Sequence, residues 1–335
     1  MSEAVLTRTL AKAVAAEALA PSNDAPLALS VERLAAVAGD ALVGLVFFGS
    51  RRTGAARVDS WSAYDVFAVV SRYGPFYDAM RRAGLLTRPA WLLALASRVL
   101  APTQISLRFG PGSAHLKASV IEERTLVRET GRFRHDHFCS GRLFQPALVL
   151  YARDAAARET LVGCLVSALR ETWGWARPWL PAAFDAEGYG RSALATSMHW
   201  EVRPEPSGRA EQLWQAQREL QVPVLEALLA ELAAKGELVP AGSPATWSPA
   251  RETGALERMR RSAYFRLSML RATARWLKHM LSFEGWLDYI VQKASRHSGQ
   301  TIELSERERR YPLLFLWGRA ARHIIRARKG ERKKG

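Results

Sequence analysis

Short apolar runs, bounded by glycine and polar turn residues, recur along the first half of the chain. Runs of this length and composition predict buried β-strands. The predicted strands are residues 41–48, 64–70, 105–110, 115–121 and 146–151. Helical patterns precede the first strand, up to about residue 38, and follow the second strand at residues 74–86. This alternation predicts a mixed α/β or α+β domain.

The pattern changes to helical spacing after Arg153. Residues 155–173 place apolar side chains at i, i+3 and i+4, which is typical of an amphipathic helix. Turn-rich connections at residues 202–209 and 239–249 interrupt the region that follows. The predicted parts are a strand-containing domain over residues 1–155, a helical substrate domain over 156–255 and a basic helical region over 256–335.

Three tryptophans stand at the end of the first helical pattern of the second half, in the tract TWGWARPWLP. Such a tract predicts a packed loop or a contact between domains, and an aromatic belt at a membrane interface is the alternative. The three residues are Trp173, Trp175 and Trp179.

Apolar and basic stripes run together at helical spacing in the last part of the chain. After Leu256 the apolar stripe is Ala263, Leu267, Leu270, Ala274, Leu277 and Leu281, and the basic stripe is Arg271, Arg275 and Lys278. After Pro312 the apolar stripe is Leu314, Trp317, Ala321 and Ile324, and the basic stripe is Arg319, Arg322, Arg326, Lys329 and Lys333. The second pair predicts an amphipathic helix lying on an anionic membrane surface, with a terminal helix packed on the domain as the alternative.

The charge of the chain favours an anionic partner. Its 335 residues have a formal net charge of +16, and residues 307–335 hold eleven Arg or Lys against two Glu. Nucleic acid, an acidic membrane surface and phosphorylated substrates all fit such an excess. The two cysteines, Cys139 and Cys164, lack the spacing of a zinc site. No apolar run reaches about 18 residues, so we expect no membrane-spanning helix, and the first residues predict an ordinary helix rather than a targeting peptide.

A glycine-serine pair marks the most informative point of the sequence. Gly49 and Ser50 end one predicted strand, a loop rich in arginine follows, and Asp65 opens the next strand. Glycine lets the backbone turn tightly, and the amides that follow can point at phosphate oxygens. Arg51 adds positive charge to this loop, and a carboxylate such as Asp65 is a ligand that Mg²⁺ prefers. A turn cap is the alternative role for Asp65.

The predicted metal site has only one acid on its strand. Ala63 and Phe67 occupy the positions two residues before and after Asp65, whereas a two-metal site uses two or three carboxylates. Side chains from elsewhere in the chain would have to complete the set, and spacing does not choose among them. The candidates are Asp59, Glu122, Glu123 and Glu201.

Three later segments extend the pattern: KASVI at residues 117–121, GRLFQP at 141–146 and SMHWEVR at 197–203. Together with FGS and YDVF, and in this order, they resemble the mitochondrial-type phosphatidate cytidylyltransferases. This translocator-maintenance family belongs to the polymerase-beta-like nucleotidyltransferases. The chain differs from the family pattern at Ala118 and Ser119, where the family has Tyr-Gly, at Gln145, where it has Lys, and at Glu201.

The resemblance implies a fold and a reaction. The expected fold is of the α+β class, with a nucleotidyltransferase-like mixed sheet and flanking helices, followed by a mainly helical C-terminal region. The expected reaction transfers CMP from CTP to phosphatidate with Mg²⁺ as the cofactor, giving CDP-diacylglycerol and pyrophosphate. Such a protein would be cytoplasmic and peripheral on the inner face of a membrane.

The resemblance also assigns roles to individual residues. Gly49, Ser50 and Arg51 would bind the nucleotide, Asp65 and Lys117 would be catalytic with Asp65 as the metal ligand, and Arg142, Glu201 and Arg203 would hold substrate phosphate. Other roles stay open for several of them: an exposed strand residue for Lys117, an interdomain ion pair for Arg142, and a cross-strand pair for Glu201 and Arg203. The two histidines of the segment RHDHF, His135 and His137, predict a solvated loop rather than a metal cluster.

Two other functional classes compete with this one. The positive charge also fits a nucleic-acid-binding protein or a nucleotidyltransferase acting on RNA, although no RNA-recognition motif or zinc knuckle is present. The single strand acid also fits a nucleotidyltransferase fold that has lost catalysis and acts only as a binding module. We favour the cytidylyltransferase, with CTP, phosphatidate and an anionic membrane as partners and no nucleic acid.

Overall fold

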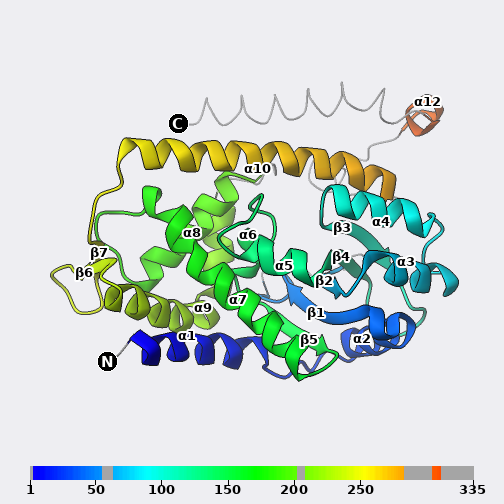
Figure 1. Ribbon diagram of the computed structural model, residues 1–335, viewed down its shortest axis with the longest axis horizontal. Helices are drawn as coiled ribbons and strands as arrows, with labels where there is room; N and C mark the ends of the chain where they lie inside the picture. The colour runs from blue at the N-terminus through cyan, green and yellow to red at the C-terminus, as the bar shows by residue number, and fades with distance from the viewer. Residues whose placement is uncertain (1–2, 55–62, 202–207, 283–303, 311–335) are drawn as a thin grey trace.

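A five-stranded mixed sheet forms the centre of the computed structural model, which describes residues 3–54, 63–201, 208–282 and 304–310 (Figure 1). In the sheet the strands follow the order β3-β4-β2-β1-β5. Their bounds are β1 Leu42–Phe48, β2 Tyr64–Val70, β3 Thr103–Leu107, β4 Leu116–Glu122 and β5 Leu148–Ala152. All five predicted strands are therefore present, and β2 has the predicted bounds.

The strand directions bring the start of two strands to the end of a third. β1 runs antiparallel to β2, while β2 and β4 run parallel to each other. In this register Asp65 lies opposite Phe48 on one side and opposite Lys117 on the other. The last residue of β1, the Gly49 turn and the first residues of β2 and β4 therefore share one edge of the sheet.

Helices cover both faces of the sheet because successive strand side chains point to opposite sides. Phe48, Phe67 and Ile121 belong to the core under the long helices, whereas Val66 and Val120 belong to the second core, on the opposite face. The helices of the first half are α1 Glu3–Ala18, α2 Ala25–Ala38, α3 Tyr73–Arg82, α4 Ala90–Val99, α5 Glu123–Thr130 and α6 Ser140–Leu143, with the short 3₁₀ turn η1 Gly39–Ala41. The predicted α+β class is confirmed.

Long helices make up the second half (Figure 1). They are α7 Ala155–Ala176, α8 Ala186–His199, α9 Arg209–Ala234 and α10 Ala255–Ser282, with the 3₁₀ turn η2 Arg177–Trp179, the short strands β6 Leu238–Pro240 and β7 Trp247–Pro249, and the short helix α12 Glu306–Arg310. α1 packs against α7 and α9, so residues on both sides of the predicted boundary at 155 share one apolar core. The strands β6 and β7 form a small hairpin in a segment that the sequence predicts as a connection only.

Helix α10 turns its basic stripe inward and its apolar stripe outward. Arg275 is buried, while Leu267, Leu270 and Leu277 are exposed. The tryptophan tract packs on the same helix, since the rings of Trp175 and Phe265 lie 6.2 Å apart. Trp173 and Trp175 belong to α7 and Trp179 to η2, so the predicted loop is helical, while the predicted packing role is confirmed.

In the part of the chain that the structure describes, no helix combines the length and apolar character needed to cross a bilayer. Three predictions fall on residues outside the described ranges: the amphipathic helix after Pro312, the phosphate-binding role of Arg203 and the metal-binding role of Asp59.

Candidate active site

The predicted glycine turn lies directly beside the predicted acid. Gly49 has φ +88°, a backbone conformation that side chains other than glycine adopt only with strain. A Cβ at this position would stand 3.4 Å from Oδ2 of Asp65. The amide of Arg52 donates to the carbonyl oxygen of Gly49 at 3.0 Å and closes the turn, with the half-buried Ser50 inside it. The turn therefore leaves its backbone and the carboxylate facing the same space.

Lys117 completes this group from the neighbouring parallel strand. Its Nζ lies 3.3 Å from Oδ1 of Asp65. The Asp65 side chain is 36% exposed and that of Lys117 is 18% exposed, so solvent reaches the carboxylate more than the ammonium. Lys117 is thus mostly covered, and the two predicted catalytic residues form an ion pair that a substrate can approach.

Arg51 is held against the aromatic ring that opens β2. Its guanidinium lies 3.7 Å from the centre of the Tyr64 ring, and its Nη2 donates to the Tyr64 hydroxyl at 2.8 Å. That hydroxyl donates to Asp24, in the connection between α1 and α2. Partial burial, together with the hydrogen bond and the negative charge of Asp24, raises the pKa of Tyr64 to about 12. Tyr64 therefore stays protonated and orients Arg51 at the turn.

The next arginine of the loop, Arg52, forms a structural ion pair. Arg52 Nη2 pairs with Glu17 of α1 at 2.5 Å. Burial raises the pKa of the Glu17 carboxyl more than the arginine lowers it. The pair ties the glycine turn to the N-terminal helix, a contact that no local pattern in the sequence indicates.

Arg142 and Glu201 meet as an ion pair, as one of the open alternatives for Arg142 proposes. Nη2 of Arg142 lies 3.5 Å from Oε2 of Glu201, and Nη1 donates to the carbonyl oxygen of Phe138 at 2.9 Å. The guanidinium also lies 3.8 Å from the centre of the Phe138 ring, which in turn packs edge-on against Phe67 of β2. The pair joins α6 to the second residue after α8, with both side chains mostly covered.

A histidine from α10 approaches the same surroundings, and the sequence gives no signal for it. Burial lowers the pKa of His279 to about 2, with further lowering by the charges of Lys278, Arg275, Lys117 and Arg142. The imidazole is therefore neutral, and its Nδ1 accepts a hydrogen bond from the amide of Gln104 at 3.4 Å. This hydrogen bond places the end of α10 against β3, beside β4, which carries Lys117.

The segment RHDHF is only in part the solvated loop that the sequence predicts, because the side chain of His135 is 50% exposed whereas Asp136 and His137 are buried. His137 is buried, with its Nε2 3.0 Å from Oγ of Ser197 and its amide donating to Oγ of Ser268 at 2.9 Å. Burial and the charge of Arg134 lower the pKa of His137 to about 3. Asp136 and His137 are buried because α10 lies over them, through long-range contacts that local polarity does not reveal.

Asp65 faces the glycine turn, and the other acids proposed for the metal site lie elsewhere wherever the structure describes them. Glu122 ends β4 five positions beyond Lys117, roughly 16 Å away along the strand, and Glu123 follows it. Glu201 is paired with Arg142. Among the residues that the structure describes, no group of three or more His, Cys, Asp or Glu side chains is arranged to hold a metal ion. A Mg²⁺ ion is often bound by one or two carboxylates together with substrate phosphates, so Asp65 fits a site that the nucleotide would complete.

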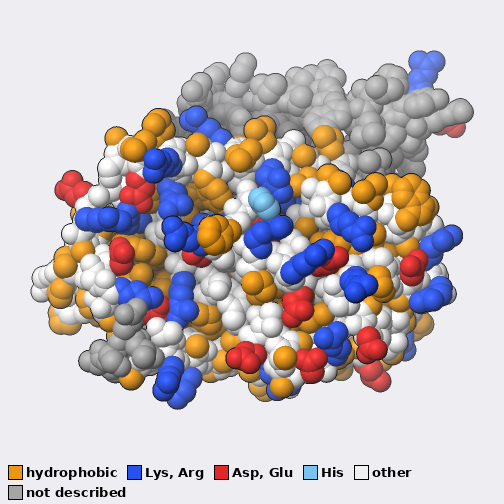
Figure 2. Space-filling view, in the orientation of Figure 1, with side chains coloured by type: hydrophobic (Ala, Val, Ile, Leu, Met, Phe, Trp, Pro, Cys, Tyr) orange, Lys and Arg blue, Asp and Glu red, His pale blue; other side chains and the backbone are white. Residues whose placement is uncertain are grey.

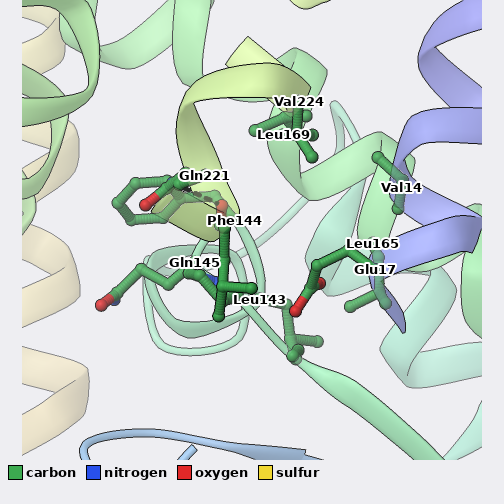
Figure 3. Close-up of a pocket in the computed structure, with 12 residues that line it drawn as sticks. Val14, Glu17, Leu143, Phe144, Gln145, Leu165, Leu169, Gln221 and Val224 are labelled. Carbon is green, nitrogen blue, oxygen red and sulfur yellow. Dashed lines mark hydrogen bonds between the residues drawn. The ribbon is translucent and has the colours of Figure 1, made fainter. Parts of the chain in front are cut away.

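A small pocket at the start of β5 is too small for the nucleotide (Figure 3). It lies between α1, α7, α9 and the segment around Gln145, and its volume of about 30 Å³ leaves room for about two water molecules. Gln145 stands where the resembled family has lysine, and its amide donates to the carbonyl oxygen of Gly141 at 2.8 Å. In this chain Gln145 therefore supports the backbone of the α6 turn.

Comparison with known proteins adds no family to these observations. No protein-family model matches the chain, and no curated protein matches it.

Proposed function

We propose that this protein is a CTP:phosphatidate cytidylyltransferase, which transfers CMP from CTP to phosphatidate and releases pyrophosphate. The observation that carries the proposal is the contact between the Gly49 turn and Asp65, with Lys117 on the same carboxylate. Backbone amides, one carboxylate and a lysine at one sheet edge are the groups that bind a triphosphate and its metal ion. The order of the sequence motifs supports the same reaction.

In the proposed reaction the chain positions charged groups and forms no covalent intermediate. A phosphatidate oxygen attacks the α-phosphorus of CTP, and the bond from that phosphorus to the bridging oxygen breaks, so pyrophosphate leaves with the electron pair. Catalysis of this kind depends on in-line positioning and on cationic groups that stabilise the developing charge. A bound Mg²⁺ would supply further charge stabilisation at the phosphate oxygens.

Each residue has one part in this proposal. The amides after Gly49 and the Ser50 hydroxyl bind the terminal phosphates, and Arg51, held by Tyr64, adds positive charge beside them. Asp65 would hold the metal ion. Lys117, now paired with Asp65 at 3.3 Å, would bind a phosphate oxygen of the nucleotide.

Arg142 and Glu201 have a less direct part. Arg142 already has three partners, in Glu201, the Phe138 carbonyl and the Phe138 ring. We propose that it holds the lipid phosphate, while Glu201 fixes its orientation. Arg203 keeps the predicted role of binding substrate phosphate. The protein would act at the inner face of an anionic membrane, with the segment after Pro312 as one attachment.

A binding module without catalysis is the second candidate function. The observation that favours it is that the described residues contain no group of three or more His, Cys, Asp or Glu side chains, at Asp65 or elsewhere, that could hold a metal ion. In that case the Asp65–Lys117 pair would position a bound nucleotide and nothing more. The chain would then bind CTP with no lipid product.

One assay separates these candidates. The full-length protein is incubated with CTP labelled in the cytosine ring, short-chain phosphatidate and Mg²⁺, and the lipid-soluble label is counted. We expect label in the lipid phase that requires Mg²⁺ and phosphatidate and is lost in the Asp65→Asn variant. CTP binding without transfer would favour the binding module, and retention of an RNA probe in a gel without CTP turnover would favour the nucleic-acid-binding class.

A further inference from the structure

Helix α4 presents an apolar side to solvent. Trp91 is 69% exposed and Val99 is 73% exposed, and the exposed Leu95 lies between them on the same side of the helix. The opposite side, with Leu93 and Ala94, is buried in the core. Large apolar side chains at successive turns of one helix are seldom left in contact with water unless they have a partner.

Helix α10 presents a second apolar side. Met259, Leu267, Leu270 and Leu277 are all exposed and recur at helical spacing. The exposed charged residues of this helix up to Leu277 are Arg258, Arg260 and Arg266, and none of its exposed residues in that range is acidic. The surface of α10 therefore combines apolar contact area with positive charge.

The segment that follows α4 is bonded to the last turns of α10. Nζ of Lys278 donates to the carbonyl oxygen of Pro102 at 2.8 Å and to Oγ1 of Thr103 at 2.9 Å, and Nε of Arg275 donates to the carbonyl oxygen of Ala101 at 3.1 Å. These contacts fasten the segment after α4 to the last turns of α10. Figure 2 shows hydrophobic side chains over α4 and along the edge where α10 runs.

A cavity lined by arginines opens beside the C-terminal end of α4. It has a volume of about 610 Å³. Its lining includes the arginines Arg98, Arg124, Arg128 and Arg271 and the carboxylates Glu122 and Glu129. Each buried carboxylate already binds an arginine: Glu122 accepts from Arg124 at 2.9 Å, and Glu129 accepts from Arg128 at 3.1 Å. Arg271 in turn pairs with the buried Asp136 at 3.0 Å. The four arginines still outnumber the two carboxylates of the lining, so the cavity wall has an excess of positive charge.

The sequence of this region has the same bias. Residues 79–121, which include α4, contain six Arg or Lys and no Asp or Glu. Four arginines converge on a cavity whose rim includes the exposed apolar Val99. A ligand that matches both features has an anionic phosphate next to hydrocarbon.

We propose that α4 and α10 form a docking surface for an anionic lipid bilayer, with a headgroup phosphate in the arginine-lined cavity. This surface is separate from the predicted attachment through the segment after Pro312. The cavity lies at the carboxyl ends of β2 and β4, whereas Lys117 lies near the amino end of β4, roughly 16 Å away. The bound headgroup therefore anchors the protein and is not the substrate of the proposed reaction.

The bilayer explains features that a nucleic acid would not. An RNA backbone would use the arginines but would leave Trp91, Val99 and the leucines of α10 in water. A bilayer surface takes both kinds of side chain, because tryptophan prefers the interface and arginine pairs with anionic headgroups.

Co-sedimentation of the full-length protein with vesicles tests the proposal. The vesicles are phosphatidylcholine alone or phosphatidylcholine with phosphatidylglycerol, an anionic lipid that the proposed reaction does not consume. Two double variants probe the surface: Trp91→Ser with Val99→Ser, and Arg98→Gln with Arg128→Gln. The matched controls are Val239→Ser on β6 and Arg218→Gln on α9, both exposed and away from this surface.

We expect binding to anionic vesicles at low salt, weakened by about tenfold or more in each double variant and unchanged in the controls. Added salt should also weaken binding, because charges are screened over about 8 Å at physiological ionic strength. The proposal is wrong if the wild-type protein does not sediment with anionic vesicles, if both double variants bind as well as the controls, or if only removal of residues 312–335 abolishes binding.

The proposed reaction is tested separately. Turnover on soluble short-chain phosphatidate should be the same in the double variants and in the wild type, since the cavity lies outside the catalytic group. Vesicle binding without any turnover would leave the docking surface supported and the proposed reaction refuted. Turnover with no vesicle binding would support the proposed reaction and refute the docking surface.

Discussion

Two aspartates, each paired with a basic residue, occupy very different places in this molecule. Asp65 lies 3.3 Å from Lys117 and its side chain is 36% exposed, whereas Asp136 lies 2.6 Å from Arg275 and its side chain is 5% exposed. Asp136 also accepts from Arg271 at 3.0 Å and from the amide of Phe138 at 2.9 Å. The first carboxylate is open to a ligand, and the second is saturated by the protein itself.

The two aspartates also differ in how their surroundings affect the carboxylate. Burial acts to raise the pKa of Asp136, but Arg275, the Phe138 amide and Arg271 outweigh it and lower the pKa below the ordinary value. Asp136 is thus a structural anion that holds α10 in place. Among the described residues Asp65 pairs with Lys117, and its side chain is 36% exposed. A buried pair stabilises the fold, and a half-exposed pair can exchange its partner for a substrate.

The largest effect should come from Asp136→Asn. We expect it to lower the free energy of unfolding by about 3–5 kcal/mol, because Arg275 would be left buried without its anion. Chemical denaturation measures this loss. The double variant with Arg275→Met should recover part of it, since both charges are then gone. A loss under about 1 kcal/mol in the single variant would show that the pair is not a major contribution to stability.

The Asp65→Asn variant should lose turnover and keep its stability. We expect a loss of turnover of roughly 10²–10³-fold or more, the range for removing one electrostatic group from an active site, with little change in stability. Steady-state transfer of label from CTP to lipid and thermal unfolding measure the two quantities. Asp78→Asn, at an exposed position of α3, is the matched control and should leave both unchanged. Near-normal turnover of Asp65→Asn would refute its role as the metal ligand.

Gly49→Ala should have a smaller effect, on both stability and CTP binding, at the sheet edge that carries Asp65. Its φ of +88° would cost an alanine about 1–2 kcal/mol, and the new Cβ would stand 3.4 Å from the Asp65 carboxylate. We expect lower stability together with weaker CTP binding. Gly163→Ala is the control, because that glycine is helical with open space around it and alanine there should stabilise by about 0.5–1 kcal/mol. Equal stability of the two variants would mean that the turn tolerates a side chain.

The smallest effect concerns pH and the buried His137. Its pKa is about 3 in the folded protein and near 6.5 when unfolded, so the unfolded chain binds more protons between these values and stability falls as pH falls through this window. We expect a loss of about 1 kcal/mol between pH 6.5 and 5.5 from this group. Denaturation of the wild type and of His137→Phe at both pH values measures it. The variant should show the shallower dependence, and equal slopes would contradict the burial of a neutral imidazole.

The sheet could be predicted from the sequence because its apolar runs are short and bounded by turn residues. β2 is the clearest case, since the observed strand Tyr64–Val70 matches the predicted residues. Helix α4 has no counterpart among the predictions, because WLLALAS is a short apolar run that fits either a strand or a helix. The hydrophobic pattern of a segment distinguishes a helix from a strand only when its period is unambiguous.

The candidate site could be predicted only in part. The glycine turn and Asp65 are close in sequence, so their contact follows from a hairpin-like return of the chain. Lys117 reaches Asp65 through the parallel pairing of β2 and β4, and His279 comes from a helix more than 150 residues later. The inward direction of the basic stripe of α10 was equally hidden, because it depends on Asp136 rather than on the helix itself.

The bridge between Asp136 and Arg275 also sets an order of events during synthesis. The two residues are 139 positions apart, which at 5–20 residues per second corresponds to roughly 7–28 s of translation. During that interval the nascent chain already contains the carboxylate but not the guanidinium that compensates it. The bridge that covers this segment therefore forms only after Arg275 has been synthesised. A chain that ends before Arg275 lacks it and leaves the carboxylate of Asp136 without that partner.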